Sequence, residues 1–538
     1  MRDVLSARAF GRPQAAAPKP VKRGDVLLTS KPFVYLVSSS LKSLYCDYCL
    51  AKKGRNGLQR CSGCRLEHYC GKECQAAAWG LHRLECRHLK RVAPRVPPDA
   101  ARLMAKVILK LQHGGDKLAE EISTNYSRKF KDLMNHYSDI KKDSKRHEHF
   151  VSLVAVLESF LVGMELPNEA ELQGIFGRIC VNSFSITDPD QNTVGTGVYL
   201  AASIFDHSCE PNAYVAFDGF KLTCRSLVDL PVLDWSKLRI SYIDVLNPRE
   251  ERQADLQRRY YFLCDCVRCS SPEWEEEQVG PLCCGNTNCS GMVFIPEGLR
   301  RHQVSKKVPD CRENSAEVIN EEINISSQSS GTEKIYDPES QGKREILTAS
   351  CSHCGTSKPM TPDQVEMYYS VASFCKEQLD LCKDHYYLDL CEKGLERATG
   401  VLHDLNIFLV RLRDAAFEAS ISLSHWEKAS TYGSLNIEGL SHYYGKKHPS
   451  LGMVLLKLGK ILVYVGSFSK AVGYLARAES ILKASHGTTH PLYTEQAAPL
   501  YMQAREEMRE AEKMAGWKGK KGLSGTSGGG PLCRTTCG

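Results

Sequence analysis

The pattern of apolar and polar positions divides the chain into β-rich and helical stretches. Residues 25–28 and 33–37 read as two short strands, and residues 181–245 return to β-branched and aromatic runs broken by turn residues. Residues 100–180 have helical spacing of their apolar positions, and so does the stretch 362–514. These patterns predict an α+β protein built from several domains.

An internal repeat lies in the last helical stretch. The segment 426–429 (Trp-Glu-Lys-Ala) recurs as 468–471 (Phe-Ser-Lys-Ala), and 444–449 recurs as 486–491, each copy keeping a Gly-x2-His-Pro turn. Both offsets are 42 residues. A fixed period of this length predicts stacked helical hairpins of the tetratricopeptide type.

The composition excludes two classes of protein and singles out cysteine. Of 538 residues, 42% are hydrophobic and 25% charged, which excludes wholesale disorder. The net charge of +7 is too small to predict nucleic-acid binding by itself. The most apolar stretch, 150–166, carries Glu158 and Glu165, so no membrane span is expected. The 24 cysteines fall largely in C-x2-C and C-x-C pairs, and no secretory h-region precedes them, so we expect reduced thiols that bind zinc inside the cell, in cytoplasm and nucleus.

The boundaries follow from these patterns. The predicted parts are an irregular lead (1–22) that could also be a transit-like peptide, N-terminal strands (23–45), a cysteine block (46–86), a helical insert (87–180), a β-rich core (181–246), a second cysteine cluster (247–270), an insertion with a polar loop (271–361), a repeat domain (362–514) and a disordered tail (515–538).

The first cysteine block has the ligands for two closed metal sites. Its four pairs are Cys46 with Cys49, Cys61 with Cys64, Cys70 with Cys74, and His82 with Cys86. The x3 spacing of the last two pairs places each pair one turn apart on a short helix. Eight soft ligands fill two tetrahedral sites and leave no position open for catalysis.

Two further ligand sets are less complete in sequence. Cys264, Cys266 and Cys269 are three ligands that need a fourth, for which we expect Cys209, with Cys283 or Cys284 as the alternative. Cys284, Cys289, Cys351 and Cys354 have the ligand count of a zinc ribbon across a long polar loop, and the alternative is a set of free cysteines.

These motifs resemble those of a known family. The block 46–86, including Tyr69 and Trp79, resembles a MYND finger. The ordered series Asn-Ser-Phe-Ser-Ile (182–186), Gly-Val-Tyr (197–199), Asp-His-Ser-Cys-Glu-Pro-Asn (206–212), Ile-Ser-Tyr-Ile-Asp (240–244) and C-x-C-x2-C looks like the SET domain of the SET-and-MYND (SMYD) lysine methyltransferases. That family places its finger and its helical C-terminus where this chain carries them.

The resemblance implies methyl transfer from S-adenosylmethionine to lysines of histone or other proteins, as a chromatin regulator. It implies that the first and third finger pairs share one zinc ion and the second and fourth another. With the Cys264–Cys269 cluster we expect three structural zinc ions, and the ribbon cysteines could hold a fourth. Tyr242 is implied as the catalytic tyrosine, although a core tyrosine would fit the same strand. The remaining implied roles are cofactor binding for Ser203, Asp206, His207, Tyr260 and Phe262, and lining of the substrate channel for Phe184 and Tyr199.

Three departures from the family bear on activity. Arg12-Pro13-Gln14 stands where the family has a Gly-x-Gly turn. Asp206 replaces an asparagine, and an ionised carboxylate only accepts hydrogen bonds. The segment 231–237 replaces a shorter Gly-Glu-Glu turn.

These departures motivate a second hypothesis. A catalytically weak or inactive scaffold would recruit partners through the finger, whose family binds proline-rich peptides, and through the repeat domain. A third hypothesis is DNA binding through the basic residues Lys52, Lys53, Arg55, Arg60 and Arg65 of the finger, for which a solvated basic face is the alternative. We expect a monomer.

Overall fold

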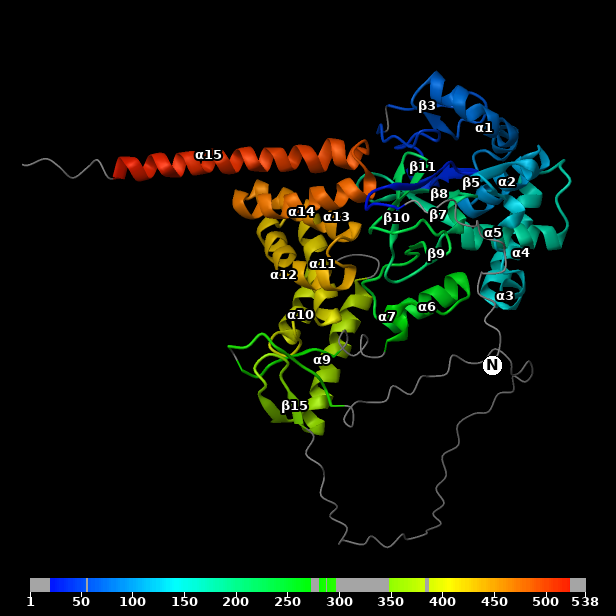
Figure 1. The fold of residues 1–538 in the computed structure, drawn as a ribbon. Helices are drawn as coiled ribbons and strands as arrows, with labels where there is room; N and C mark the ends of the chain where they lie inside the picture. The colour runs from blue at the N-terminus through cyan, green and yellow to red at the C-terminus, as the bar shows by residue number, and fades with distance from the viewer. Residues whose placement is uncertain are drawn as a thin grey trace, which may run out of the picture. The chain divides into compact units, whose positions relative to one another are not determined.

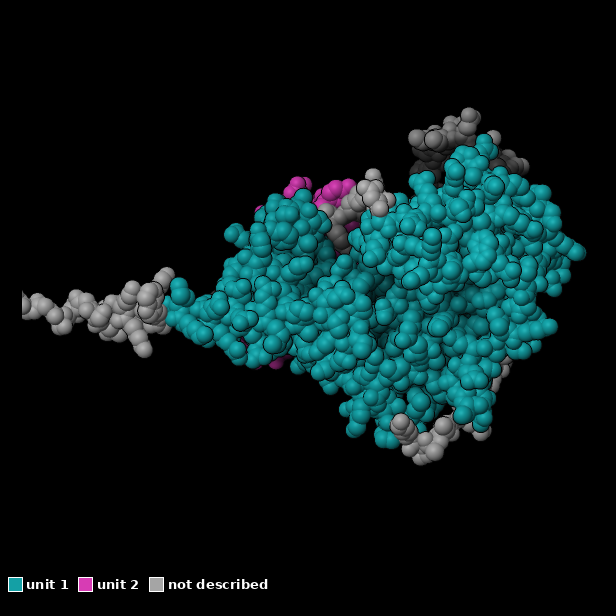
Figure 2. Space-filling model, turned by 90° about the horizontal axis from the view of Figure 1, so that it is seen from above, with its two compact units in different colours: residues 1–275, 413–538 teal, residues 276–412 magenta. Residues whose placement is uncertain are grey.

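The computed structural model describes residues 20–54, 57–271, 280–286, 288–296, 348–382 and 387–522, with side chains up to Met514. Arg12-Pro13-Gln14, Arg55, the predicted polar loop and residues 523–538 lie outside these ranges. The chain forms two compact units, residues 1–275 with 413–538, and residues 276–412, which Figure 2 colours separately. Within the described residues, no helix has both the length and the apolar character needed to cross a membrane.

The β-rich part of the first unit contains two three-stranded antiparallel sheets and several two-stranded pairs (Figure 1). One sheet has the order β1-β11-β10 and the other β2-β8-β7, while β9 and β12 pair in parallel. The strands are β1 (Val26–Ser30), β2 (Val34–Val37), β3 (Gln59–Arg60), β4 (His68–Tyr69), β5 (Ala119–Ser123), β6 (Tyr126–Lys129), β7 (Ser183–Thr187), β8 (Thr193–Val198), β9 (Asp206–His207), β10 (Ala213–Asp218), β11 (Lys221–Ser226) and β12 (Arg239–Ile240). The strands predicted near residues 25–28 and 33–37 are confirmed as β1 and β2.

Helices surround these strands and cover the finger. They are α1 (Lys72–Val92), α2 (Asp99–Gln112), α3 (Tyr137–Lys142), α4 (Ser144–Phe160), α5 (Glu169–Asn182), α6 (Arg249–Tyr260) and α7 (Val267–Ser270), with short 3-10 turns η2 (Ser39–Leu41), η3 (Gly115–Lys117), η4 (Phe130–Asp132) and η5 (Ala202–Ile204). Helix α2 is buried along nine consecutive residues, from Ala101 to Leu109. It is the centre of one apolar core, whereas a second core lies between the sheets.

The stretch predicted as helical over 100–180 contains a hairpin, β5–β6, which the helical spacing of its neighbours hid. Its strands are joined by the two residues Thr124 and Asn125, and turn-forming Asn suits that position. Only Ile122 and Arg128 of the hairpin are buried, so its apolar signal was weak. Cys70 also departs from the prediction, because it precedes α1, so that Cys70 and Cys74 do not share a helical turn.

The C-terminal part of the first unit is helical, as the pattern predicts. It contains most of α11 (Ile407–Ser422), then α12 (Trp426–Tyr444), α13 (Pro449–Tyr464), α14 (Phe468–His486), the π-helical turn η7 (Leu492–Ala497) and α15 (Ala498–Gly522). Helices α12 and α14 have 19 residues each, in keeping with the 42-residue repeat. Helix α15 extends eight residues beyond the predicted end at 514, because its last turns lack a helix-breaking proline.

The second unit is smaller and combines two β-hairpins with helices. The strands are β13 (Leu282–Cys283), β14 (Met292–Val293), β15 (Thr348–Ser350) and β16 (Ser357–Pro359), and the helices are α9 (Pro362–Leu381), α10 (Leu388–Ala398) and the start of α11. The Thr361 side chain caps α9 by accepting a hydrogen bond from the backbone N–H of Gln364. The Gln364 side chain in turn accepts one from the backbone N–H of Thr361.

Candidate functional site

The finger brings its eight ligands into two groups of four. Cys46, Cys49, Cys70 and Cys74 form the first cluster, and Cys61, Cys64, His82 and Cys86 form the second. Within each cluster, the ligand atoms lie within 4.8 Å of one another. The sulfur atoms of Cys49 and Cys70 are 3.5 Å apart, and those of Cys61 and Cys86 are 3.8 Å apart. Tetrahedral zinc with Zn–S bonds of about 2.3 Å separates two sulfurs by about 3.8 Å, so the donor sets fit zinc.

Two more clusters have the same geometry. The third consists of Cys209, Cys264, Cys266 and Cys269, and the fourth of Cys284, Cys289, Cys351 and Cys354. The Cys209–Cys269 sulfur distance is 3.6 Å, and that of Cys284–Cys354 is 3.7 Å. Cys209 therefore lies where the fourth ligand was expected. Cys283 belongs to neither cluster, because its thiol donates to the Leu402 carbonyl.

Arg252 lies against the third cluster. Its guanidinium is fully buried, with Nε 3.3 Å from the Cys209 sulfur and Nη2 3.7 Å from that of Cys269. Four thiolates around one Zn²⁺ carry two net negative charges, so a buried cation beside them offsets part of that charge.

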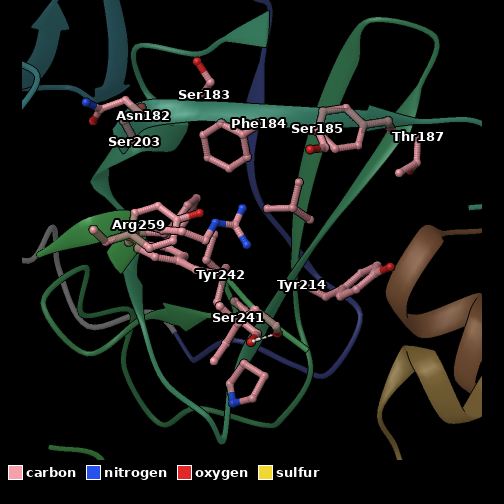
Figure 3. Close-up of a pocket in the computed structure, with 18 of the residues that line it drawn as sticks. Asn182, Ser183, Phe184, Ser185, Thr187, Ser203, Tyr214, Ser241, Tyr242 and Arg259 are labelled. Carbon is pink, nitrogen blue, oxygen red and sulfur yellow. Dashed lines mark hydrogen bonds between the residues drawn. The ribbon is translucent and has the colours of Figure 1, made fainter. Parts of the chain in front are cut away.

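A cavity of about 320 Å³ lies in the β-rich part of the first unit. Phe184 projects into it from β7, and Tyr242 enters from the segment that follows β12 (Figure 3). Ser203 of η5 and Tyr260 at the end of α6 also line it. Four predicted site residues from distant parts of the sequence are therefore brought to one space.

Tyr242 is held at both ends. Its hydroxyl donates to the Phe205 carbonyl, and its backbone N–H donates to His207 Nδ1 at 3.0 Å. Burial, reinforced by Asp206 and Tyr260, raises the pKa of Tyr242 well above its usual value, so the phenol is neutral. The Tyr260 ring lies 4.9 Å from that of Tyr242.

His207 connects Tyr242 to the third cluster. Because its Nδ1 accepts the Tyr242 N–H, the ring proton belongs on Nε2, which lies 3.4 Å from the Cys209 sulfur. The Phe262 ring packs 6.1 Å from that of His207. His207 and Phe262 thus support Tyr242 from behind and do not line the cavity.

Tyr199 does not lie where the prediction placed it. Its side chain is fully buried, its hydroxyl donates to the Phe220 carbonyl at 2.7 Å, and its ring meets Phe184 edge-on at 5.6 Å. Tyr199 follows the last residue of β8, and the bond of its hydroxyl to Phe220 holds the ring against Phe184 instead of in the cavity. Tyr199 backs the wall of the cavity. Asp206 also lies outside the lining. It is on β9, where its strand-register partner is Arg239 of β12.

Several residues that line the cavity were not expected from the sequence. These are polar or ionisable side chains from five regions: Ser185, Thr187, Gln191, Tyr214, Arg259, His448 and Ser450. Burial raises the pKa of Tyr214 to about 12 and lowers that of His448 to about 4, where Arg268 contributes, so both are uncharged. The repeated Gly-x2-His-Pro turn was a signal for His448, although it carried no information about the cavity.

The longer turn that replaces the Gly-Glu-Glu motif is well packed. Trp235 is buried against Phe205, with ring centroids 6.1 Å apart. The Asn212 side chain makes two hydrogen bonds at the end of this turn. It donates to the Lys237 carbonyl and accepts from the Arg239 N–H. The substitution therefore supports the residue whose carbonyl accepts the Tyr242 hydroxyl.

Comparison with known proteins agrees with this geometry. The sequence profile of the MYND finger matches residues 46–86. The chain is 28% identical to human histone-lysine N-methyltransferase SMYD3 over 478 residues, covering 88% of this chain and 91% of that protein. Over most of its length it is similar to the SMYD family.

Other SMYD-family relatives match over similar lengths. Histone-lysine N-methyltransferase ASHR1 of Arabidopsis thaliana is 26% identical over 93% of this chain and 92% of its own length. N-lysine methyltransferase SMYD2 of Bos taurus is 24% identical over 89% and 93%. The family is thus one of lysine methyltransferases with a zinc-binding MYND finger, which accounts for the first two clusters.

Proposed function

We propose that this protein transfers a methyl group from S-adenosylmethionine to the side-chain amine of lysines in proteins. The observation that carries the proposal is Tyr242, a neutral phenol fixed by Phe205 and His207 at the wall of a cavity lined by aromatic rings. The relatives named above are lysine methyltransferases, which supports the same reaction class. We further propose that residues 181–246 form the SET domain of the family and 362–514 its TPR-like domain.

The aromatic wall favours the reactive form of the substrate. A lysine side chain that enters between Phe184 and Tyr260 leaves water, and desolvation favours the neutral amine over the ammonium ion. The Tyr242 proton is committed to the Phe205 carbonyl, so the hydroxyl oxygen keeps lone pairs that can accept an N–H bond from the amine. Such a bond orients the nitrogen lone pair.

When bound, S-adenosylmethionine supplies an electrophilic methyl group, and the protein's contribution is alignment. We place the cofactor at the segment 203–207, which begins with Ser203 and lies beside Tyr242. Arg128, a buried guanidinium whose Nε and Nη1 have no hydrogen-bond partner, fits a ligand that carries a carboxylate. His207 and Phe262 hold the Tyr242 backbone in register.

The protein substrate fits between β7 and the start of α13. Ser185 and Thr187 line the cavity from the strand, and His448 and Ser450 line it from the helical part of the same unit. Hydroxyl groups and a neutral imidazole suit an uncharged backbone better than acidic or basic side chains. We propose histone or non-histone lysines as substrates, and proline-rich peptides as partners of the finger.

Calorimetry with S-adenosylmethionine tests the proposal. The folded, zinc-loaded protein is expected to release binding heat with one site per chain, and a Tyr242→Phe variant should bind with nearly the same affinity, because the phenol acts on the amine. Absence of binding heat in a folded, zinc-loaded protein would refute the methyltransferase proposal.

The scaffold function remains the second candidate, and Asp206 favours it. A carboxylate at this place repels the carboxylate of the cofactor, unlike the family's asparagine. DNA binding has weaker support, because the only observation for it is that Lys52, Lys53, Arg60 and Arg65 are exposed, as they would be on a solvated basic face.

A further inference from the structure

Arg128 on β6 is a buried cation with an incomplete set of partners. The residue is only 8% exposed. Nη2 donates to the Asp132 carbonyl at 3.1 Å, while Nε and Nη1 have no hydrogen-bond partner. Among the residues that the structure describes, no carboxylate forms an ion pair with Arg128.

The carboxylate nearest in the hairpin is already committed. Glu120 is the cross-strand partner of Arg128 in the β5–β6 register. One of its oxygens accepts from Ser30 Oγ at 2.7 Å and from Lys31 N at 3.1 Å, and the other accepts from Ala201 N at 2.9 Å. Glu120 therefore serves to fasten the hairpin, and Arg128 keeps two unused donors.

A buried guanidinium without a counter-ion is unfavourable, because burial removes its hydration. Such an arrangement is expected where a ligand completes the site. A guanidinium binds a planar anion with two oxygens, of which a carboxylate is the common example, through two adjacent nitrogens. In Arg128 the unused Nε or Nη1 can do so together with the second N–H of Nη2. The feature therefore indicates an anionic ligand with this geometry.

The place of Arg128 identifies the ligand. The Glu120–Ala201 bond docks the hairpin onto the segment that leads into η5 and β9. Ile122 of the hairpin packs in the same apolar core as Ala202 and Phe205. Arg128 lies close enough to Asp206 and Tyr242 to interact electrostatically with both. Arg128 thus lies near the residues to which we assign the cofactor.

We propose that Arg128 binds the α-carboxylate of S-adenosylmethionine, an assignment that rests on the function proposed above. Asp206 could then accept from the α-ammonium group, and the repulsion between Asp206 and the cofactor carboxylate is offset by Arg128. Together the two side chains match both charges of an amino acid. This pairing explains how a chain with aspartate in place of the family's asparagine binds the cofactor.

The test compares two ligands by calorimetry on the full-length, zinc-loaded protein: S-adenosylmethionine and its decarboxylated analogue. The parent protein is expected to bind the analogue about 10- to 100-fold more weakly, the usual range for a lost hydrogen bond to a charged group. In Arg128→Met, affinity for S-adenosylmethionine should fall by a similar factor and the preference between the two ligands should disappear. Arg128→Lys keeps the charge and should retain part of the preference.

Arg178→Met is the matched control. Arg178 also donates Nη2 to a backbone carbonyl of η4, that of Lys131 at 3.1 Å, but its guanidinium lies over the Phe130 ring. This variant should bind both ligands like the parent. Without ligand, Arg128→Met should melt no lower than the parent, because it removes an uncompensated buried charge. A merely structural arginine would lower the melting temperature and leave the ligand preference unchanged.

The outcomes separate the two proposals. Equal binding of S-adenosylmethionine by the parent and Arg128→Met, or equal binding of the two ligands by the parent, would overturn the role of Arg128 and leave the methyltransferase proposal standing. No binding of either ligand by the folded parent would overturn both. The comparison of ligands on the parent needs no variant, so misfolding of Arg128→Met cannot obscure the result.

Discussion

His490 Nε2 donates to the Phe217 carbonyl oxygen at 2.8 Å, although the two residues are 273 positions apart. His490 Nδ1 accepts the backbone N–H of Leu492 at 3.1 Å, so the neutral ring is used at both nitrogens. One imidazole thus caps the turn before η7 and fastens the C-terminal helices to β10.

Replacing His490 should loosen this attachment. His490→Ala leaves the Phe217 carbonyl and the Leu492 N–H without these partners, and we expect a loss of about 1–3 kcal/mol in the free energy of unfolding, measured by urea denaturation. His425→Ala is the control, because His425 is exposed before α12, and it should change stability by less than about 0.5 kcal/mol. Equal effects of the two variants would contradict the assigned role.

Acid should destabilise the protein through its buried histidines. Burial lowers the pKa of His486 to about 3, with His490 and Arg225 contributing, and that of His448 to about 4. Below pH 6.5 the unfolded chain takes up protons that these folded rings do not, so stability falls as pH falls from about 6.5 to 4.

Urea titrations at several pH values measure this dependence. Each histidine contributes up to about 1.4 kcal/mol per pH unit. His486→Phe should flatten the curve over that window, whereas His425→Phe should leave it unchanged. A curve for His486→Phe as steep as that of the parent would show that His486 does not titrate on unfolding.

A buried network of charges holds the finger against α2. Arg102 is fully buried, and its Nη2 lies 2.6 Å from a Glu67 carboxylate oxygen. Lys106 pairs with Glu85. Arg102→Met would leave Glu67 and Glu85 short of a counter-charge, and we expect a loss of about 3–5 kcal/mol in unfolding free energy.

The exposed ion pair of Arg258 and Asp255 serves as the control for the loss expected in the buried network. Arg258→Gln should cost less than about 1 kcal/mol, because water screens the ions. If the two substitutions had similar effects in urea denaturation, the buried network would not be what holds the finger to α2.

Zinc content tests the number of occupied clusters, and variants test the third and fourth individually. Native mass spectrometry of the zinc-loaded chain should find four ions, one fewer in Cys351→Ser and one fewer in Cys209→Ser. Cys180→Ser, which changes a thiol outside the clusters, should retain all four. A parent with three ions and an unchanged count in Cys351→Ser would show that the fourth cluster holds free cysteines.

Local patterns predicted much of this architecture, because ligand spacing and repeats are encoded over short distances. The ligand pairs of the finger and the equal helices α12 and α14 are examples, whereas the interleaving of those pairs was implied by the resemblance to the MYND finger. What could not be predicted depends on contacts between distant segments. The two Gly-x2-His-Pro turns look alike in sequence, yet His490 bonds to β10 while His448 lines the cavity.

Side-chain direction was the other unpredictable quantity. Phe184 and Tyr199 were both expected in the channel, but only Phe184 lines the cavity, because the Tyr199 hydroxyl is bound to the distant Phe220 carbonyl and its ring packs against Phe184. Arg128 could not be singled out from the sequence either. What distinguishes it is that two of its own donors are unused and that Glu120 is bound elsewhere, and both depend on the folded structure.

The most direct test of the central claim is mass spectrometry of lysine methylation. Purified zinc-loaded protein, S-adenosylmethionine, core histones and a library of lysine peptides are incubated together, alongside Tyr242→Phe. We predict added methyl groups on lysine side chains in the parent reaction, and a loss of about 100-fold or more in Tyr242→Phe with cofactor binding retained. Equal methylation by Tyr242→Phe, or bound cofactor in the parent with no methylated lysine in any substrate, would contradict the account.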